Sequence, residues 1–561
     1  MKQPYSSSTP RTPLLRFLQH TFRLAVWANE PGAPTPEALV AQAAASRRRF
    51  VTNTAKVGLL AGVGGVLTAC EAALEEPAAP KTTAFGNAAT QPRIVVVGAG
   101  VAGLNCAYQL SKAGLRADVY EASNRVGGRI FTAQGLMAPG VTTELGGEFI
   151  DSGHRDMLQL AQEFGLPLLD VEAASETALI KDTYFFRGRH YTVAEVVRAF
   201  QPYAAQITAD IRSLPNTITF ENYGNAARLD NLSIAAYFDS LGMTGLIREL
   251  LDVAYVTEYG RETAEQTSIN FLWLFSPDTK KDTFDVFGIS DERYKIRGGN
   301  QRLTDALAQR LPGQLTLEHK LVALGQRGAQ YELRFERPDG SALTVVADYV
   351  VLTVPFSVLR NVALNLPLPA WKLNAIQNLN YGTNTKLFLG FNSRPWRARG
   401  YTGYLFSDRA AQSGWDSSQL QPGAGGVYTV YLGGQQGVSL GTGSPQAQVS
   451  TYLPVLEAVW PGCQAAYNGR VERFHWPTHP FTRGSYACYR PGDYTTMAGA
   501  ERKPVDNLFF AGEHCSLDFQ GFMNGAAETG RVAAEDVARA VRGQKVAWLP
   551  RLRAALSAVP A

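Results

Sequence analysis

The sequence has 561 residues, of which 45% are hydrophobic and 18% are charged. A chain of this length and composition is globular and too long for one hydrophobic core, so more than one domain is expected. The formal net charge of +4 belongs to the start of the chain, because residues 1–70 carry 8 Lys and Arg against 2 Asp and Glu, leaving 45 and 47 in the rest. Nothing in this charge distribution points to nucleic acid as a partner.

The start of the chain, from Met1 to Cys70, resembles an export leader. Ser46–Val51 (SRRRFV) is similar to a twin-arginine motif, and Val57–Ala69 is an apolar run too short to span a bilayer permanently. Leu67–Cys70 resembles a lipobox in which Cys70 is lipidated. These motifs predict an exported protein that touches the membrane only through a lipid anchor; a basic linker before a buried helix is the alternative. The sequence assigns no role to Leu14–Trp27.

The leader is followed by a tether, and the chain ends in a short tail. Residues 71–91 are rich in Pro, Ala and Thr and contain three early glutamates, a composition that predicts disorder. Residues 546–561 are assigned to the C-terminal tail. The folded part is therefore expected between these two segments.

A strand, a glycine turn, a helix and a second strand open the folded part. Arg93–Val97 is a short β-branched run that suits a buried parallel strand. Gly98, Gly100 and Gly103 then supply GxGxxG, in which the glycines permit a tight turn, approach of backbone to a pyrophosphate and close packing of the next helix. Arg116–Tyr120 returns as a strand that ends at Glu121, whose carboxylate can accept both ribose hydroxyls. Together these features predict a dinucleotide site.

The continuation through Arg125, Gly127, Gly128 and Arg129 favours FAD over NAD. With it, the sequence resembles the flavin-containing amine oxidase family, which includes monoamine, polyamine and L-amino acid oxidases. The resemblance recurs at four later segments: Glu144–Asp151, Arg297–Leu303, Tyr381–Phe391 and Asn507–Ala534. It implies FAD-binding roles for Gly98, Gly100, Ala102, Gly103, Glu121, Ala122, Arg125, Gly128, Arg129, Gly146, Gly147, Glu148, Leu321, Trp476, Gly512, Glu513 and Met523.

The middle of the chain alternates between helical and strand patterns. Apolar residues recur at three- and four-residue spacing in four segments: Asp156–Phe164, Val193–Leu214, Ser233–Phe238 and Leu246–Glu258. Thr263 with Gln266 is expected to cap a helix over Ser268–Phe275. Strands are expected at Thr316–Leu324, Tyr331–Phe335, Asp348–Val354, Lys386–Phe391 and Val427–Leu432.

The expected fold class is α/β with mixed α+β elements. A Rossmann-type FAD-binding domain would comprise residues 92–160, 290–355 and 477–545. A substrate-binding domain with a mixed sheet and a helical insert would comprise residues 161–289 and 356–476, interleaved with it. His475 and His479 are separated by Trp476-Pro477, which prevents the helix that a zinc pair would need, so no metal is proposed.

Two positions are informative about how the flavin would be used. The resemblance implies that Lys386 is catalytic and bonds a water at flavin N5; the strand pattern alone equally allows an outward, solvated lysine. Ser485 stands where monoamine oxidases carry the cysteine that links the flavin. Because serine cannot form that thioether and Cys488 should lie on the opposite side of an extended segment, non-covalent FAD is expected.

The resemblance also implies the substrate contacts. Tyr486 and Phe522 match two aromatics that flank an amine in front of the flavin. Asp151 matches an acid that polyamine oxidases use; hydrogen bonding to backbone in the Ser152-Gly153 turn is the alternative. L-amino acid oxidases have an arginine just after the glycine pair, and here Glu148 follows Gly146-Gly147 instead, which counts against amino acids.

The expected function is FAD-dependent oxidative deamination of a primary amine, with O2 as electron acceptor and H2O2 as product. Diamine or polyamine oxidation is the first alternative and L-amino acid oxidation the second. A desaturase, an isomerase or a non-enzymatic flavin protein represents a different class, which Lys386 and the segment around Met523 disfavour. The partners would be a small amine and O2, with homodimerisation left open.

Overall fold

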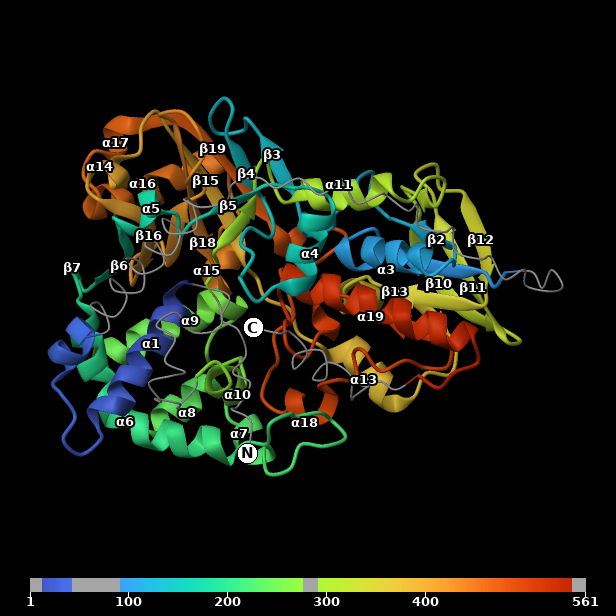
Figure 1. The fold of residues 1–561 in the computed structure, drawn as a ribbon, viewed down its shortest axis with the longest axis horizontal. Coiled ribbons are helices and arrows are strands. Elements are labelled where there is room, and N and C mark those ends of the chain that lie inside the picture. The colour runs from blue at the N-terminus through green and yellow to red at the C-terminus, as the bar shows by residue number, and fades with distance from the viewer. Residues whose placement is uncertain (1–12, 43–90, 276–290, 547–561) are drawn as a thin grey trace, which may run out of the picture.

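The computed structural model describes residues 13–42, 91–275 and 291–546. The twin-arginine-like motif, Cys70 and nearly all of the predicted tether and C-terminal tail lie outside the described residues. Within those three ranges, no helix combines the length and apolar character needed to cross a membrane. The described chain contains three larger sheets, with helices around them (Figure 1).

A five-stranded parallel sheet holds the predicted dinucleotide motif. Its strand order is β20-β13-β1-β2-β9, with every neighbouring pair parallel. Strand β1 is completely buried, as expected of a parallel strand covered on both faces. The strands are β1 Ile94–Val97, β2 Ala117–Tyr120, β9 Leu315–Thr316, β13 Tyr349–Leu352 and β20 Leu508–Phe510.

Helices α3 (Val101–Lys112) and α19 (Met523–Val541) lie side by side along this sheet (Figure 1). They approach so closely that a Cβ at Gly530 would come 2.2 Å from the Ala102 carbonyl oxygen. The Asn105 side chain also donates to the Ala527 carbonyl at 2.7 Å. Two segments that lie far apart in the sequence therefore build one layer of the fold.

A four-stranded sheet and two short antiparallel strand pairs extend this domain. The four-stranded sheet has the order β12-β11-β10-β14, and the pairs are β3-β4 and β5-β8. Their bounds are β3 Thr132–Gln134, β4 Thr142–Glu144, β5 Leu168–Asp170, β8 Tyr294–Ile296, β10 Lys320–Arg327, β11 Gln330–Glu336, β12 Ala342–Ala347 and β14 Ala363–Asn365.

A seven-stranded mixed sheet forms the second layer, in the upper left of Figure 1. Its order is β19-β15-β18-β17-β16-β6-β7, antiparallel except for the parallel pair of β6 and β16. The strands are β6 Ile180–Phe186, β7 Arg189–His190, β15 Thr385–Phe391, β16 Tyr401–Ser407, β17 Ser413–Asp416, β18 Gly426–Leu432 and β19 Tyr467–His475. The expected mixed α/β fold class is confirmed. The stretch after Asp151 contributes strands as well as helices, which the sequence reading did not anticipate.

Helices from the predicted insert gather below the mixed sheet in Figure 1. The insert helices are α6 Val193–Ser213, α7 Ala227–Asp230, α8 Ile234–Ser240, α9 Gly245–Tyr259 and α10 Ser268–Leu272. Helix α1 (Pro13–Ala28), from the predicted leader, packs against α6 and α9. Thr192 and Glu195 form a reciprocal capping box at the start of α6.

The predicted cap of α10 is wrong. Thr267 caps this helix, because its hydroxyl accepts from the Ile269 N–H at 3.3 Å. The Thr263 hydroxyl instead donates to Asp252, and the Gln266 amide donates to carbonyls of the α9 end and its following turn. The TxxQ pattern is therefore used for tertiary contacts, upstream of the true start of the helix.

The described chain also contains other helices and two 3-10 turns. They are α4 Arg155–Glu163, α5 Ala174–Thr177, α11 Gln301–Gln309, α12 Phe356–Leu359, α13 Ala370–Asn378, α14 Pro395–Ala398, α15 Gly434–Ser439, α16 Pro445–Val459, α17 Cys463–Ala466, α18 Asp493–Met497 and the 3-10 turns Trp476–Thr478 and Glu513–Cys515.

Candidate active site

A large cavity lies between the parallel sheet and the mixed sheet. Its lining includes every predicted cofactor and substrate residue except Gly103, together with Lys386. These residues come from the two ends of the chain and from both layers. The predicted site residues are thus brought together in one cavity, while Gly103 serves the packing behind it.

The GxGxxG turn has the geometry that its glycines predict. Gly98 has φ of +106°, in the region that favours glycine. A Cβ at Gly103 would lie 1.9 Å from the Gly98 carbonyl oxygen, so a larger residue there would force α3 off the turn. The Glu121 carboxylate accepts from the Ala99 N–H at 2.7 Å and from Ser123 at 2.8 Å. Glu121 therefore stiffens the turn as well as facing the cavity.

Two helices begin at the cavity without a side-chain cap. Helix α3 starts after Gly100 and α19 starts after Phe522, and neither N-cap side chain accepts a hydrogen bond from its helix. Gly100, Val101, Phe522 and Met523 all line the cavity. Uncapped N–H groups and the positive end of a helix dipole are suited to phosphate or another anionic group.

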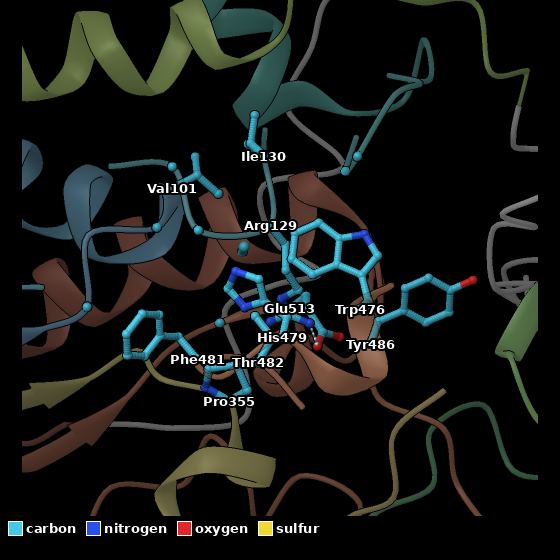
Figure 2. Close-up of a pocket in the computed structure, with 18 of the residues that line it drawn as sticks. Val101, Arg129, Ile130, Pro355, Trp476, His479, Phe481, Thr482, Tyr486 and Glu513 are labelled. Carbon is cyan, nitrogen blue, oxygen red and sulfur yellow. Dashed lines mark hydrogen bonds and ion pairs between the residues drawn. The ribbon is translucent and has the colours of Figure 1, made fainter. Parts of the chain in front are cut away.

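Gly146 and Gly147 pack closely against Arg129 and the start of α19. A Cβ at Gly147 would lie 2.7 Å from the Met523 Sδ, and one at Gly146 would lie 1.9 Å from the Arg129 carbonyl oxygen. The Arg129 guanidinium donates to Glu513 at 2.7 Å and to the Ser485 carbonyl at 2.8 Å. Figure 2 shows this Arg129–Glu513 pair beside Trp476, whose indole N–H donates to the Leu145 carbonyl at 3.1 Å.

Lys386 is buried, because both faces of β15 are covered. Its ammonium group donates to the Glu144 carbonyl at 3.0 Å, the Gly146 carbonyl at 2.9 Å and the Glu148 carboxylate at 3.0 Å. The solvated alternative is therefore wrong for this lysine. These three acceptors use all three N–H bonds of the Lys386 ammonium. A water molecule that links Lys386 to flavin N5 would therefore have to replace one of the three acceptors.

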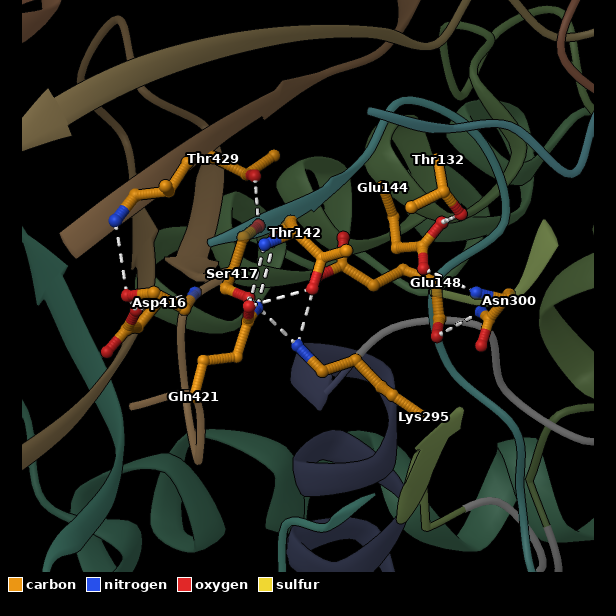
Figure 3. A network of polar contacts seen from close by, with 12 residues as sticks. Thr132, Thr142, Glu144, Glu148, Lys295, Asn300, Asp416, Ser417, Gln421 and Thr429 are labelled. Carbon is orange, nitrogen blue, oxygen red and sulfur yellow. Dashed lines mark hydrogen bonds and ion pairs between the residues drawn. The ribbon is translucent and has the colours of Figure 1, made fainter. Parts of the chain in front are cut away.

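Glu148 is shared by two lysines. One carboxylate oxygen of Glu148 pairs with the Lys386 ammonium. The other oxygen lies 3.3 Å from the Lys295 ammonium, which also donates to the Ser417 carbonyl at 3.2 Å (Figure 3). Burial alone would raise the pKa of Glu148, but the two ammonium groups outweigh burial and hold its pKa below the usual value. The triad carries two positive charges and one negative charge beside the cavity.

Glu144 lies behind this triad. Its carboxylate accepts from the Thr132 hydroxyl at 2.8 Å and the Asn300 N–H at 2.7 Å (Figure 3). Burial raises the pKa of Glu144 to about 7 in spite of these donors. The Asn300 side chain in turn donates to the carbonyls of Gly147 and Glu148. This network fixes the Glu144–Asp151 segment against the start of α11.

Aromatic side chains form the front of the cavity. Tyr486 donates its hydroxyl hydrogen to the Glu258 carbonyl at 2.8 Å, so the Tyr431 hydroxyl, 2.9 Å away, donates to Tyr486. Trp415 and Phe149 make an edge-to-face pair with centroids 5.6 Å apart. The lining of the cavity includes all four rings and Phe522.

Asp151 and His154 support the Phe522 side of this wall. The Asp151 carboxylate accepts from the Glu292 N–H at 2.9 Å and lies 3.3 Å from His154 Nε2. His154 Nδ1 accepts from the Asp151 N–H, and its ring packs edge-on against Phe522 at 4.9 Å. Burial lowers the pKa of His154, which is therefore neutral. Asp151 thus contacts Glu292 and His154.

The comparisons with known proteins agree with this arrangement. The family model described as flavin containing amine oxidoreductase matches residues 101–538. The chain belongs to this family. A flavin-containing amine oxidase from Danio rerio is 23% identical over 79% of this chain and 85% of its own, and an L-amino-acid oxidase from Demansia vestigiata is 26% identical over 84% and 91%.

Solved structures show the same fold. Cyclohexylamine oxidase from Brevibacterium oxydans IH-35A superposes with a TM-score of 0.69 at 19% identity, over 81% of this chain and all of that one. Putrescine oxidase bound to putrescine gives a TM-score of 0.67 at 20% identity, over 80% and 99%. The shared fold agrees with the family assignment, and membership of the flavin-containing amine oxidoreductase family implies FAD as the cofactor.

The cavity of this amine oxidoreductase fits FAD. Its two uncapped helix starts suit the pyrophosphate and the electron-rich edge of a flavin, and Glu121 suits the ribose. The Ser485 hydroxyl donates to Asn384 at 2.7 Å. Cys488 is fully buried, and its thiol donates to the Tyr489 carbonyl and accepts from the Asn270 amide. A thioether to the flavin cannot form at serine, and Cys488 is not among the cavity-lining residues.

Sequence reasoning missed Lys295, Glu292, Trp415 and Tyr431. Lysine and glutamate are usually exposed, so single buried ones give no signal in one sequence. Tyr431 pairs directly with Lys386 across β15 and β18, and Trp415 lies on the adjacent strand β17. The alternation within Val427–Leu432 was visible, but the face of the sheet that meets the cavity depends on a strand order that one sequence does not reveal.

Proposed function

We propose that this protein oxidises primary amines with a neutral aryl or alkyl tail. When bound, FAD would supply the acceptor for the two electrons and two hydrogens that leave the carbon and nitrogen of the amine, and O2 would take up both electrons and both hydrogens to give H2O2. The resulting imine is hydrolysed by water to an aldehyde and ammonia. The observation that carries the proposal is the aromatic wall of Tyr486, Tyr431, Trp415, Phe149 and Phe522.

The chain's own residues would bind the substrate and exclude water. Flat aromatic faces accept an apolar tail and a neutral amine, and they leave little room for solvent. The Tyr486 ring is fixed by its hydroxyl bonds to Glu258 and Tyr431, so its position does not depend on the substrate. A fixed wall of this kind supports orientation of the reacting carbon.

The charges around the cavity disfavour a substrate carboxylate. Among the described residues that line it, the arginines are Arg125, Arg129 and Arg483. Arg125 donates to backbone carbonyls of its own loop, Arg129 pairs with Glu513, and Arg483 is exposed. The ammonium groups of Lys295 and Lys386 share Glu148. The carboxylate of a substrate buried in the cavity would therefore lack a cationic side chain placed to pair with it, and its burial would cost several kcal/mol.

A diamine is the second candidate, and Asp151 with Glu292 supports it. Both line the cavity and both are buried. Two acidic residues in the lining would attract the distal ammonium of a diamine or polyamine. Asp151 also holds His154 against Phe522, so this acid has a packing role whichever substrate is used.

A substrate panel tests the proposal. Phenethylamine and tyramine should exceed phenylalanine and tyrosine by at least about tenfold in kcat/KM, which is roughly 1.4 kcal/mol of transition-state binding. The measurement is peroxide release from the purified protein with matched amines and amino acids. If putrescine leads the panel, Asp151→Asn should remove that lead and spare monoamines. Asp156→Asn is the control, because Asp156 pairs with Arg531 and is not part of the cavity lining. Preference for an L-amino acid would reject both candidates.

We also propose that the protein is exported by the twin-arginine route and anchored through Cys70, on the strength of Ser46–Val51 and Leu67–Cys70. Cys70→Ser should move the protein from the membrane to the soluble exported fraction, as measured by fractionation and immunoblotting. A Cys70→Ser protein that stays fully with the membrane would contradict the anchor.

A further inference from the structure

Helix α1 is buried on nearly all sides from Leu18 to Ala25. Leu18, Phe22, Leu24 and Ala25 are fully buried. The intervening polar residues are buried too, with Gln19 exposed by 3%, Thr21 by 0% and Arg23 by 7%. A helix with such burial belongs to the interior of a domain, because a helix lying on a surface keeps one face in solvent. This helix precedes the twin-arginine-like motif in the chain.

The contacts of α1 are those of a core element. The Phe22 ring packs edge-to-face against Phe200 of α6, with centroids 5.3 Å apart, and against Phe275, 5.0 Å away. The Gln19 amide donates to the Leu274 carbonyl just after α10. Apolar packing and a buried hydrogen bond thus tie α1 to both α6 and the end of α10.

The residues after α1 are also attached. The Asn29 amide donates to the Gln201 carbonyl at 2.9 Å, and Glu37 pairs with Arg198. Leu39 is fully buried in the same core. The docked segment therefore extends over residues 13–42, and it covers one face of α6.

Helix α9 connects this segment to the substrate wall. It packs against α1, and the carbonyls near its C-terminus accept the Tyr486 hydroxyl, through Glu258, and the Asn384 amide, through Thr257 at 2.8 Å. Asn384 in turn accepts from Ser485. The position of α9, which α1 supports, thus determines where Tyr486 and Ser485 lie.

We propose that residues 13–42 are a structural part of the working enzyme, occupying the groove between α6, α9 and α10 and holding the substrate wall through α9. Residues 13–42 of the same chain fill this groove. They stay bound there even when the chain is cut between residue 42 and the rest of the enzyme. Processing at Cys70 would then yield a two-piece enzyme in which the N-terminal piece remains attached.

A cut chain tests this directly. A specific protease site is inserted between Thr83 and Ala84 of the full-length holoprotein, and the cut protein is passed through a size-exclusion column. The N-terminal piece should co-elute with the flavin-containing body. Phe22→Asp should release the piece after cutting, and Leu18→Ala should release part of it. Glu30→Ala, at an exposed position, should behave like wild type.

Two further readouts show whether the segment supports α9. In the cut Phe22→Asp protein freed of its piece, proteolysis within residues 193–275 should accelerate. Amine turnover should fall about tenfold or more, because small displacements of substrate-positioning groups are costly, while the visible flavin spectrum persists. The proteolysis result does not depend on the proposed substrate. Separation of the wild-type piece from the body on the column, or release with unchanged proteolysis and turnover, would overturn the proposal.

Discussion

Replacing Lys386 by methionine is expected to slow reduction of the bound flavin by amine about 10²-fold while the protein stays yellow. The ammonium group of Lys386 is a fixed positive charge in a buried site, held by Glu144, Gly146 and Glu148. A preorganised donor or charge beside a reacting centre is worth about this factor. Lys386 bonds none of the glycine-turn residues that would hold the cofactor phosphates. Stopped-flow absorbance under anaerobic conditions measures the effect.

Lys372→Met is the matched control for Lys386→Met. Lys372 is also fully buried and bonds two backbone carbonyls, those of Ala500 and Glu501, but it is not among the cavity-lining residues. It should lose stability and keep the rate of flavin reduction. A Lys386→Met protein that reduces its flavin at the wild-type rate, or that cannot hold FAD, would show that Lys386 is structural.

Replacing Glu148 by glutamine is expected to lower the free energy of unfolding by about 3–5 kcal/mol at neutral pH. This change leaves the buried ammonium groups of Lys295 and Lys386 without their shared carboxylate, and an uncompensated buried charge has a cost of this size. Denaturant titration of the holoprotein measures it. The control is Glu249→Gln, since Glu249 pairs with Arg187 at the surface, where water screens the charges and removal of one partner should change the stability far less.

The pH dependence of the Glu148 effect follows from the lowered pKa of this carboxyl group. A carboxyl group whose pKa is lower in the folded protein binds fewer protons there than in the unfolded chain. Its stabilising contribution is therefore complete above the unfolded pKa of about 4.3 and is lost as the pH falls through the folded value. The stability difference between wild type and Glu148→Gln should shrink over that acid range. An unchanged difference would contradict the ion triad.

The nucleotide-binding half of the fold could be predicted from the sequence because its signals are local. Gly98, Gly103 and Glu121 lie close together in the sequence, and each has a steric or hydrogen-bonding role that the structure displays. The expected start of α19 at Met523 also matches. Such motifs specify backbone geometry directly, so they need no knowledge of distant partners.

The substrate half could be predicted only in part, because it is built from long-range pairings. Tyr431 reaches the cavity through its register with Lys386, and Lys295 reaches Glu148 beside the cavity from β8, which pairs with β5. The role of helix α1 could not be predicted from the sequence, because its packing partners α6 and α9 lie far along the chain, after strands β1 and β2 of the parallel sheet. Tertiary packing decides such positions, and one sequence contains no direct record of it.

The most direct test of the central claim, that the cavity between the two sheets is an FAD site that oxidises amines, is an anaerobic titration of the purified protein with phenethylamine. The protein should be yellow as isolated, its visible flavin absorbance should bleach on adding the amine, and the colour should return with peroxide when air is admitted. A protein that binds no FAD, or whose flavin stays oxidised with every monoamine and diamine offered, would contradict the claim.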